Sequence, residues 1–131
     1  MKKIIYNWSD FIGDTVNLAN KLKNYKGLTF KDVYGISRGG LIPTVIISHL
    51  LDIPFVRYEN KINSKTLIID DISDSGKTLK KLLKKHKTGM TATLWIMKET
   101  KYIPDIHIKI KNKDEWIIFP WEMSAKDYKN L

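Results

Sequence analysis

Hydrophobic positions recur along the chain with two different periods, one helical and one of strands. A first helix is predicted that begins at Ser9, as its N-cap, and ends at Gly27. Its apolar positions are Phe11, Ile12, Val16, Ala19 and Leu22. Residues 41–51 (LIPTVIISHLL) predict a buried helix, since Pro43 is compatible with a first helical turn. A third helix is predicted over 77–87, with leucines on one side and lysines largely on the other.

Short apolar runs between these helices predict strands. They are 31–36 (KDVYGI), 53–58 (IPFVRY), 66–70 (TLIID), 91–97 (TATLWIM), 105–110 (DIHIKI) and 115–119 (EWIIF). The run at 66–70 is apolar on both faces, as in a central parallel strand, whereas 105–110 alternates like an edge strand. Because strands and helices alternate, the sequence predicts one α/β domain over 1–131, with a central parallel sheet flanked by helices.

Composition narrows the class of protein. The chain has 131 residues, of which 43% are hydrophobic and 28% charged, which suits one globular core. No apolar run approaches the roughly 20 residues that span a bilayer, and the first ten residues lack the apolar region of a signal peptide. The absence of cysteine excludes disulfides, cysteine–zinc sites and thiol catalysis. We therefore expect a cytoplasmic protein that does not enter a membrane.

The net charge of +9 favours an anionic partner, such as nucleic acid, a membrane surface or a polyphosphate metabolite. The densest run, 77–87 (KTLKKLLKKHK), is interpreted as the solvated face of a helix. The sequence contains no obvious arginine-rich or aromatic platform for RNA, so nucleic acid is the less favoured partner.

Three polar segments follow predicted strands: SRGG at 37–40, DISDSGKT at 71–78 and KET at 98–100. In parallel α/β sheets, ligands bind beyond the carboxyl ends of the strands. These segments therefore predict one shared site.

The second segment has the chemistry of a phosphate site at a helix start. Free backbone N–H groups over 75–78 (SGKT) favour an anion, and Gly76 lets the backbone approach it. A Walker A loop is excluded, because Asp71 stands where that motif requires glycine. Asp70 and Asp71 can accept hydrogen bonds from a sugar diol or hold Mg²⁺ through its waters, and Asp74 can accept a proton. This combination favours a phosphorylated ribose over a ligand-free acidic cap, for which Asp74 alone would suffice.

The segment LIIDDISDSGKTL resembles the phosphoribosyl pyrophosphate (PRPP) motif of type I phosphoribosyltransferases, and Asp74 resembles that of their 6-oxopurine branch. GISRGGLIP, 35–43, resembles the pyrophosphate loop of bacterial xanthine-guanine phosphoribosyltransferases. The resemblance implies their fold, with a small C-terminal hood. It also implies a cis peptide between Ser37 and Arg38. It assigns the 5′-phosphate to Asp74, Ser75, Gly76, Lys77 and Thr78, and the pyrophosphate to Ser37, Arg38 and Gly39.

The same resemblance extends to the base. WIMKET places Lys98 where the family's lysine donates to the purine 6-oxo group. DEWIIFPWE resembles the family's closing segment, in which Trp116 would stack on the base and the backbone of Ile117 would meet its 2-position edge. Glu122 matches an acid that can help Asp70 and Asp71 hold Mg²⁺.

The implied reaction joins a purine base to the ribose of PRPP and releases pyrophosphate, with Asp74 taking or sharing the proton at purine N7. The resemblance also implies a homo-oligomer, a dimer or tetramer. One feature departs from the family: residues 57–66 (RYENKINSKT) leave only a tight turn where a long flexible loop usually closes over the reaction. A non-catalytic PRPP- or nucleotide-binding domain, and an RNA-binding regulator on the same fold, therefore remain alternatives to the enzyme.

Overall fold

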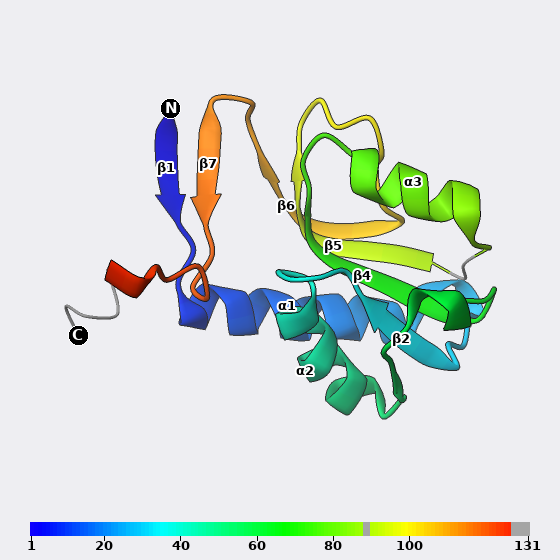
Figure 1. The fold of residues 1–131 in the computed structure, drawn as a ribbon. Coiled ribbons are helices and arrows are strands. Elements are labelled where there is room, and N and C mark those ends of the chain that lie inside the picture. The colour runs from blue at the N-terminus through cyan, green and yellow to red at the C-terminus, as the bar shows by residue number, and fades with distance from the viewer. Residues whose placement is uncertain (88–89, 127–131) are drawn as a thin grey trace.

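A five-stranded parallel sheet forms the centre of the computed structural model, which describes residues 1–87 and 90–126 (Figure 1). Its strand order is β3-β2-β4-β5-β6, and every neighbouring pair is parallel. The strands are β2 (Asp32–Gly35), β3 (Phe55–Val56), β4 (Thr66–Ser73), β5 (Met90–Met97) and β6 (Ile106–Lys111). The predicted parallel α/β fold is confirmed, with the 66–70 run at its centre and the alternating strand at its edge.

The helices cover both faces of this sheet. Helices α1 (Trp8–Lys23) and α2 (Leu41–Leu51) lie on one face, and α3 (Lys77–Lys85) lies on the other (Figure 1). Leu67 and Ile69 of β4 belong to the larger core, whereas Ile68 packs with leucines of α3. The strand is apolar on both faces because both are covered. No helix in the described part of the chain is long and apolar enough to cross a membrane.

A separate two-stranded sheet stands beside the main one. In it, β1 (Lys2–Ile5) pairs in parallel with β7 (Glu115–Ile118) (Figure 1). This sheet is the expected hood, but its first strand comes from an N-terminal segment for which no strand was predicted. Tyr6, directly after β1, is buried with its ring edge-on to Trp95 and Phe119. Its hydroxyl donates to Asp14 Oδ2 at 2.6 Å, which ties the hood to α1.

Several predicted boundaries were wrong. Helix α1 is capped by Asn7, whose Oδ1 accepts from the Asp10 N–H at 2.8 Å, and not by Ser9. The helix is followed by a short 3₁₀ turn, η1 (Tyr25–Gly27). The strand expected over 53–58 is reduced to β3, and α3 ends at Lys85.

Strand β4 runs three residues past its expected end, because Ile72 and Ser73 still pair with β5. Asp71 consequently lies within the strand together with Asp70, and not in the turn that follows it. The regular backbone there fixes the two carboxyl groups more firmly than a loop would.

Candidate active site

Two of the predicted segments leave neighbouring strands at the same edge of the sheet. The SRGG turn (37–40) follows β2 and the acidic loop (70–78) runs from the end of β4 into α3. The turn is closed by backbone hydrogen bonds from the Gly40 N–H to the Ile36 carbonyl and from the Leu41 N–H to the Arg38 carbonyl. The Ser37–Arg38 peptide is cis, as the family resemblance implies.

A groove of about 720 Å³ joins the SRGG turn to the end of β4 and to the segment after β7. Arg38, Gly39, Asp71 and Glu122 all line it. Three expected functions, pyrophosphate binding, ribose binding and metal binding, are thus brought together by residues far apart in the sequence. Trp121 adds an aromatic wall and is stacked on Phe119 with ring centroids 5.0 Å apart.

The two adjacent carboxyl groups are held by the backbone of their own strand. Asp70 Oδ1 accepts from the Asp71 N–H, and Asp71 Oδ1 accepts from the Ile72 N–H, both at 2.8 Å. Burial raises the pKa of Asp70, and the neighbouring Asp71 carboxylate raises it further. Burial also raises the pKa of Asp71. The raised pKa values favour a proton bound between the two carboxyl groups, and a bound cation can take the place of that proton.

Glu122 belongs to the same electrostatic cluster. Partial burial raises the pKa of its carboxyl group, and the charge of Asp71 acts in the same direction. Its Oε1 accepts from the Phe119 N–H at 3.4 Å, which anchors the side chain to the segment after β7.

The donor set fits one way of binding Mg²⁺. Within residues 1–87 and 90–126, no three His, Cys, Asp or Glu side chains are grouped to hold a metal by themselves. Mg²⁺ is, however, commonly held by one or two carboxylates together with waters and substrate phosphates. Backbone amides occupy one oxygen of each of Asp70 and Asp71. That pair therefore fits a cation shared with a phosphorylated ligand, and Glu122 stands at the edge of the same groove.

A smaller hollow of about 90 Å³ lies where the acidic loop enters α3. Asp70, Asp74, Ser75, Gly76 and Thr78 line it. Gly76 is the N-cap of α3, with a φ of 85°, and has no side chain to cap the helix, whereas the Ser75 hydroxyl accepts from the Lys77 N–H at 3.3 Å. The open first turn offers backbone N–H groups to an anion. The expected 5′-phosphate residues surround this hollow, except Lys77, which is exposed and does not line it.

Gly76 is also required by close packing. A β-carbon at this position would lie 2.5 Å from the backbone nitrogen of Tyr102. The acidic loop is fastened to this neighbouring segment by the Ser73 hydroxyl, which donates to the Tyr102 carbonyl at 2.7 Å. The Lys101 N–H donates to the Ser75 carbonyl at 3.1 Å. The hollow at the start of α3 is therefore braced by the loop that follows β5.

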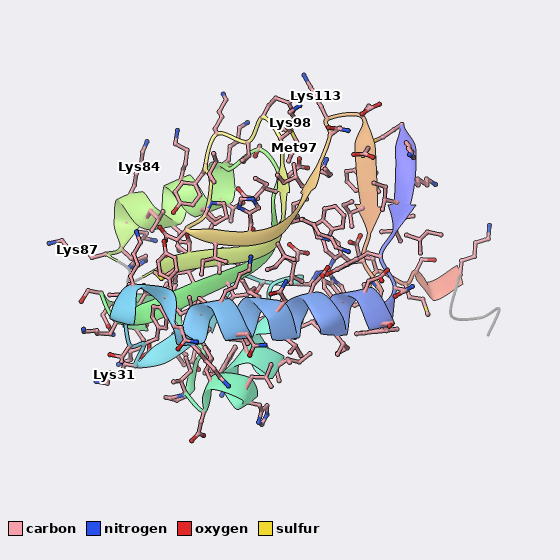
Figure 2. The ribbon with its side chains drawn as sticks, turned by 180° about the vertical axis from the view of Figure 1, so that it is seen from behind. Lys31, Lys84, Lys87, Met97, Lys98 and Lys113 are labelled. Carbon is pink, nitrogen blue, oxygen red and sulfur yellow. The ribbon has the colours of Figure 1, made fainter. Side chains whose placement is uncertain are left out.

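The residues expected to bind a base line neither the groove nor the hollow. Lys98 is exposed just after β5, and Figure 2 shows it at the same end of the molecule as Lys113. Trp116 on β7 is 49% exposed, so its ring is available to a ligand. The side chain of Ile117 is buried in the core, so only its backbone can meet a base.

Lys111 was not singled out from the sequence, where it directly follows the strand predicted over 105–110. In the structure it is buried, and its Nζ lies 2.9 Å from the Glu115 carbonyl and 3.4 Å from Asp74 Oδ1. Lys111 continues the polar positions His107 and Lys109, so no local pattern marked it as buried. Its contacts depend on the β6–β7 turn, which no local pattern specifies.

The tight turn expected at 57–66 is confirmed. It contains the short 3₁₀ helix η2 (Glu59–Lys61), and Ile62 packs into the smaller core with leucines of α3. Glu59 bonds His86 at 2.8 Å and pairs with Lys85 at 3.3 Å, at the far end of α3. The turn is thus bound to the body of the protein and does not extend over the site.

Comparison with known proteins agrees with this geometry. Residues 16–127 match the family described as phosphoribosyl transferase domain. The xanthine-guanine phosphoribosyltransferase of Cereibacter sphaeroides is 31% identical, and the match covers 74% of this chain and 72% of the relative. The crystal structure of a purine phosphoribosyltransferase from Pyrococcus horikoshii is similar, with a TM-score of 0.79 and 30% identity, covering 95% of this chain and 97% of that one.

The Helicobacter pylori xanthine-guanine-hypoxanthine phosphoribosyltransferase has the same fold, with a TM-score of 0.80 at 22% identity, covering 98% and 99% of the two chains. The family match covers most of the chain, and it includes the SRGG turn, the acidic loop and the segment after β7. The chain therefore belongs to the phosphoribosyltransferase family.

Proposed function

We propose that the chain is a purine phosphoribosyltransferase that transfers the 5-phosphoribosyl group of PRPP to a 6-oxopurine base and releases pyrophosphate, a reaction of purine salvage. The observation that carries this proposal is the convergence of the SRGG turn and the acidic loop, with Gly39 in direct contact with Asp71. The names of the relatives from Cereibacter sphaeroides and Pyrococcus horikoshii support a purine as the acceptor.

PRPP binding divides between the two loops. The open first turn of α3, with the hydroxyls of Ser75 and Thr78, holds the 5′-phosphate. Asp70 and Asp71 accept hydrogen bonds from the ribose hydroxyls. Arg38 offers a forked donor to the pyrophosphate in the groove. Mg²⁺, when bound at the Asp70–Asp71 pair, supplies positive charge against the leaving pyrophosphate.

The transfer itself breaks the bond between ribose carbon 1 and the pyrophosphate oxygen and forms a bond from carbon 1 to purine N9. Asp74 accepts the proton at N7, so the lone pair on N9 becomes more nucleophilic. Trp116 stacks on the base, Lys98 donates to its 6-oxo group, and the backbone of Ile117 contacts its 2-position edge. Arg38 offsets the charge that develops on the leaving group.

The short turn at 57–66 favours a second candidate function, which is binding of PRPP or a nucleotide without catalysis. A closing loop excludes water and completes a site, and this turn is instead held to α3 through Glu59. A domain that binds PRPP or a nucleotide without turnover would need the same hollow and groove but no such cover.

A base panel separates the two functions. The protein is incubated with PRPP, Mg²⁺ and hypoxanthine, guanine, xanthine or adenine in turn, and pyrophosphate release is measured. We expect release with the 6-oxopurines and little with adenine. If folded protein releases no pyrophosphate with any base, the proposed transferase activity is rejected. Calorimetric binding of PRPP or GMP in that case would assign the nucleotide-binding function.

A further inference from the structure

Lys111, the last residue of β6, carries a buried ammonium group at the side of the site where the base would bind. Only 5% of its side chain is exposed. Its Nζ donates to the Glu115 carbonyl at 2.9 Å and lies 3.4 Å from Asp74 Oδ1. A buried ammonium is costly unless hydrogen bonds and an opposite charge compensate it, and these two groups provide both.

The contacts of Lys111 reach all three groups assigned to the base. Its ammonium touches Asp74, and the carbonyl that it holds belongs to Glu115, directly before Trp116. Its own carbonyl accepts from the Lys98 N–H at 2.9 Å. The N7 acceptor, the stacking ring and the 6-oxo donor come from three separate segments, and this one residue connects them.

The β6–β7 turn makes the connection stiff. The Glu115 side chain accepts from the Asn112 N–H at 2.7 Å, and the Glu115 N–H donates to the Asn112 carbonyl at 3.2 Å. The carbonyl that receives the ammonium is therefore fixed. Asp74 is different, because its side chain is 50% exposed on a loop and Lys111 is its ion-pair partner. Without that partner, the carboxylate would be free to rotate.

We propose that Lys111 is a positioning residue for the purine: it holds one oxygen of Asp74, so that the other faces N7 of a base stacked on Trp116. This inference rests on the proposed function and adds a residue to it. Lys111 acts through Asp74 and does not itself contact the base. Its effect is therefore on recognition of the N7 hydrogen and not on binding of pyrophosphate in the groove.

Two guanine analogues directly measure recognition of the N7 hydrogen. In 9-deazaguanine the N7 position carries a hydrogen that Asp74 can accept, whereas 7-deazaguanine has a C–H at that position and cannot donate. Neither reacts with pyrophosphate, so calorimetry with Mg²⁺ and saturating pyrophosphate measures binding alone. We expect the wild type to prefer 9-deazaguanine by about tenfold or more, as for a charge-assisted hydrogen bond.

The substitution Lys111→Met removes the ammonium and keeps a chain of similar volume. We expect its preference between the two analogues to fall to within about threefold, while its pyrophosphate affinity stays within about twofold of the wild type. Lys109→Met is the matched control, because Lys109 lies two residues earlier on β6 and pairs with Asp14 at 3.2 Å instead of Asp74. It should keep the wild-type preference.

If Lys111 had only a structural role, Lys111→Met would lower the affinity for both analogues equally and leave the ratio of the two affinities unchanged. That result would overturn the proposal. If Lys111→Met does not fold, Lys111→Gln retains a donor for the Glu115 carbonyl without the charge and should show the same loss of preference. A wild type that binds neither analogue would overturn the proposed purine function, and this inference with it. A wild type that discriminates, together with a variant that discriminates equally, would overturn only the role of Lys111.

Discussion

The carboxyl group of Asp71 lies directly against Gly39, in the space that a β-carbon at position 39 would need. A built β-carbon would overlap Oδ2 and stand 2.7 Å from Cγ of Asp71. The turn expected to bind pyrophosphate and the acid expected to bind ribose and metal are thus in contact. Glycine at 39 is what allows it, because any side chain there would displace the carboxylate.

Gly39→Ala should therefore weaken ligand binding without unfolding the protein. The added methyl group pushes the Asp71 carboxylate away from the groove, so we expect pyrophosphate and PRPP affinity to fall by about tenfold or more. Calorimetry measures the affinity, and thermal unfolding measures stability. Gly13→Ala is the control, because nothing lies within 4 Å of its β-carbon. It should keep the affinity and gain about 0.5–1 kcal/mol of stability, as helix propensity predicts. Equal PRPP affinity in Gly39→Ala and the wild type would contradict the contact.

Asp70→Asn should make the ligand-free protein more stable at neutral and alkaline pH. Burial and Asp71 raise the folded-state pKa of Asp70 above its unfolded value, so the folded chain binds more protons than the unfolded one. Its contribution to stability is present below about pH 3.9, the usual value for Asp, and is lost as the pH rises through the raised pKa. The amide has no charge to bury and escapes this loss.

Thermal unfolding at about pH 5 and about pH 8 checks this expectation. The melting temperature of Asp70→Asn should exceed that of the wild type by about 3 °C or more at the higher pH, and by less at the lower. Asp114→Asn, at an exposed turn position, controls for the loss of one negative charge. A difference in melting temperature that becomes smaller as the pH rises would contradict a raised pKa of Asp70.

Asp74→Asn should separate PRPP binding from turnover. The amide retains the shape of the side chain in the hollow at the start of α3 but cannot accept the N7 proton. We expect kcat to fall by about 100-fold or more while the PRPP dissociation constant stays within about threefold. Pyrophosphate release and calorimetry measure the two quantities. Unchanged kcat would remove Asp74 from the role of proton acceptor.

Trp116→Leu should weaken binding of the base and leave binding of PRPP nearly unchanged. The ring is 49% exposed on β7, so its loss costs the fold little, whereas stacking on a base contributes about 1–3 kcal/mol. The KM for guanine should rise by about tenfold, and the KM for PRPP should change by less than about twofold. Equal increases in both KM values would point to a general disturbance of the hood and not to stacking.

Local patterns predicted where the polar segments of the candidate site lie, and the family resemblance supplied the functions expected of their residues. A strand, two adjacent acids and a glycine at a helix start specify their own conformation, and the parallel sheet then places such segments at one edge. The glycine at the start of α3 follows from these residues, whereas the cis Ser37–Arg38 peptide was implied by the family resemblance. The continuation of β4 to Ser73 was not, because it depends on pairing with β5 and not on the residues of the loop.

The hood shows the limit of such patterns. KKII at the start of the chain is too short to predict a strand, and it becomes one only because β7 lies beside it. The ion pair between Lys111 and Asp74 joins residues that no periodicity relates. The sequence by itself determined the fold class and the polar residues that the two loops carry, because these depend on neighbours along the chain. The tertiary structure alone decided which charges meet, because burial and distance between segments arise only when the sheet and hood are assembled.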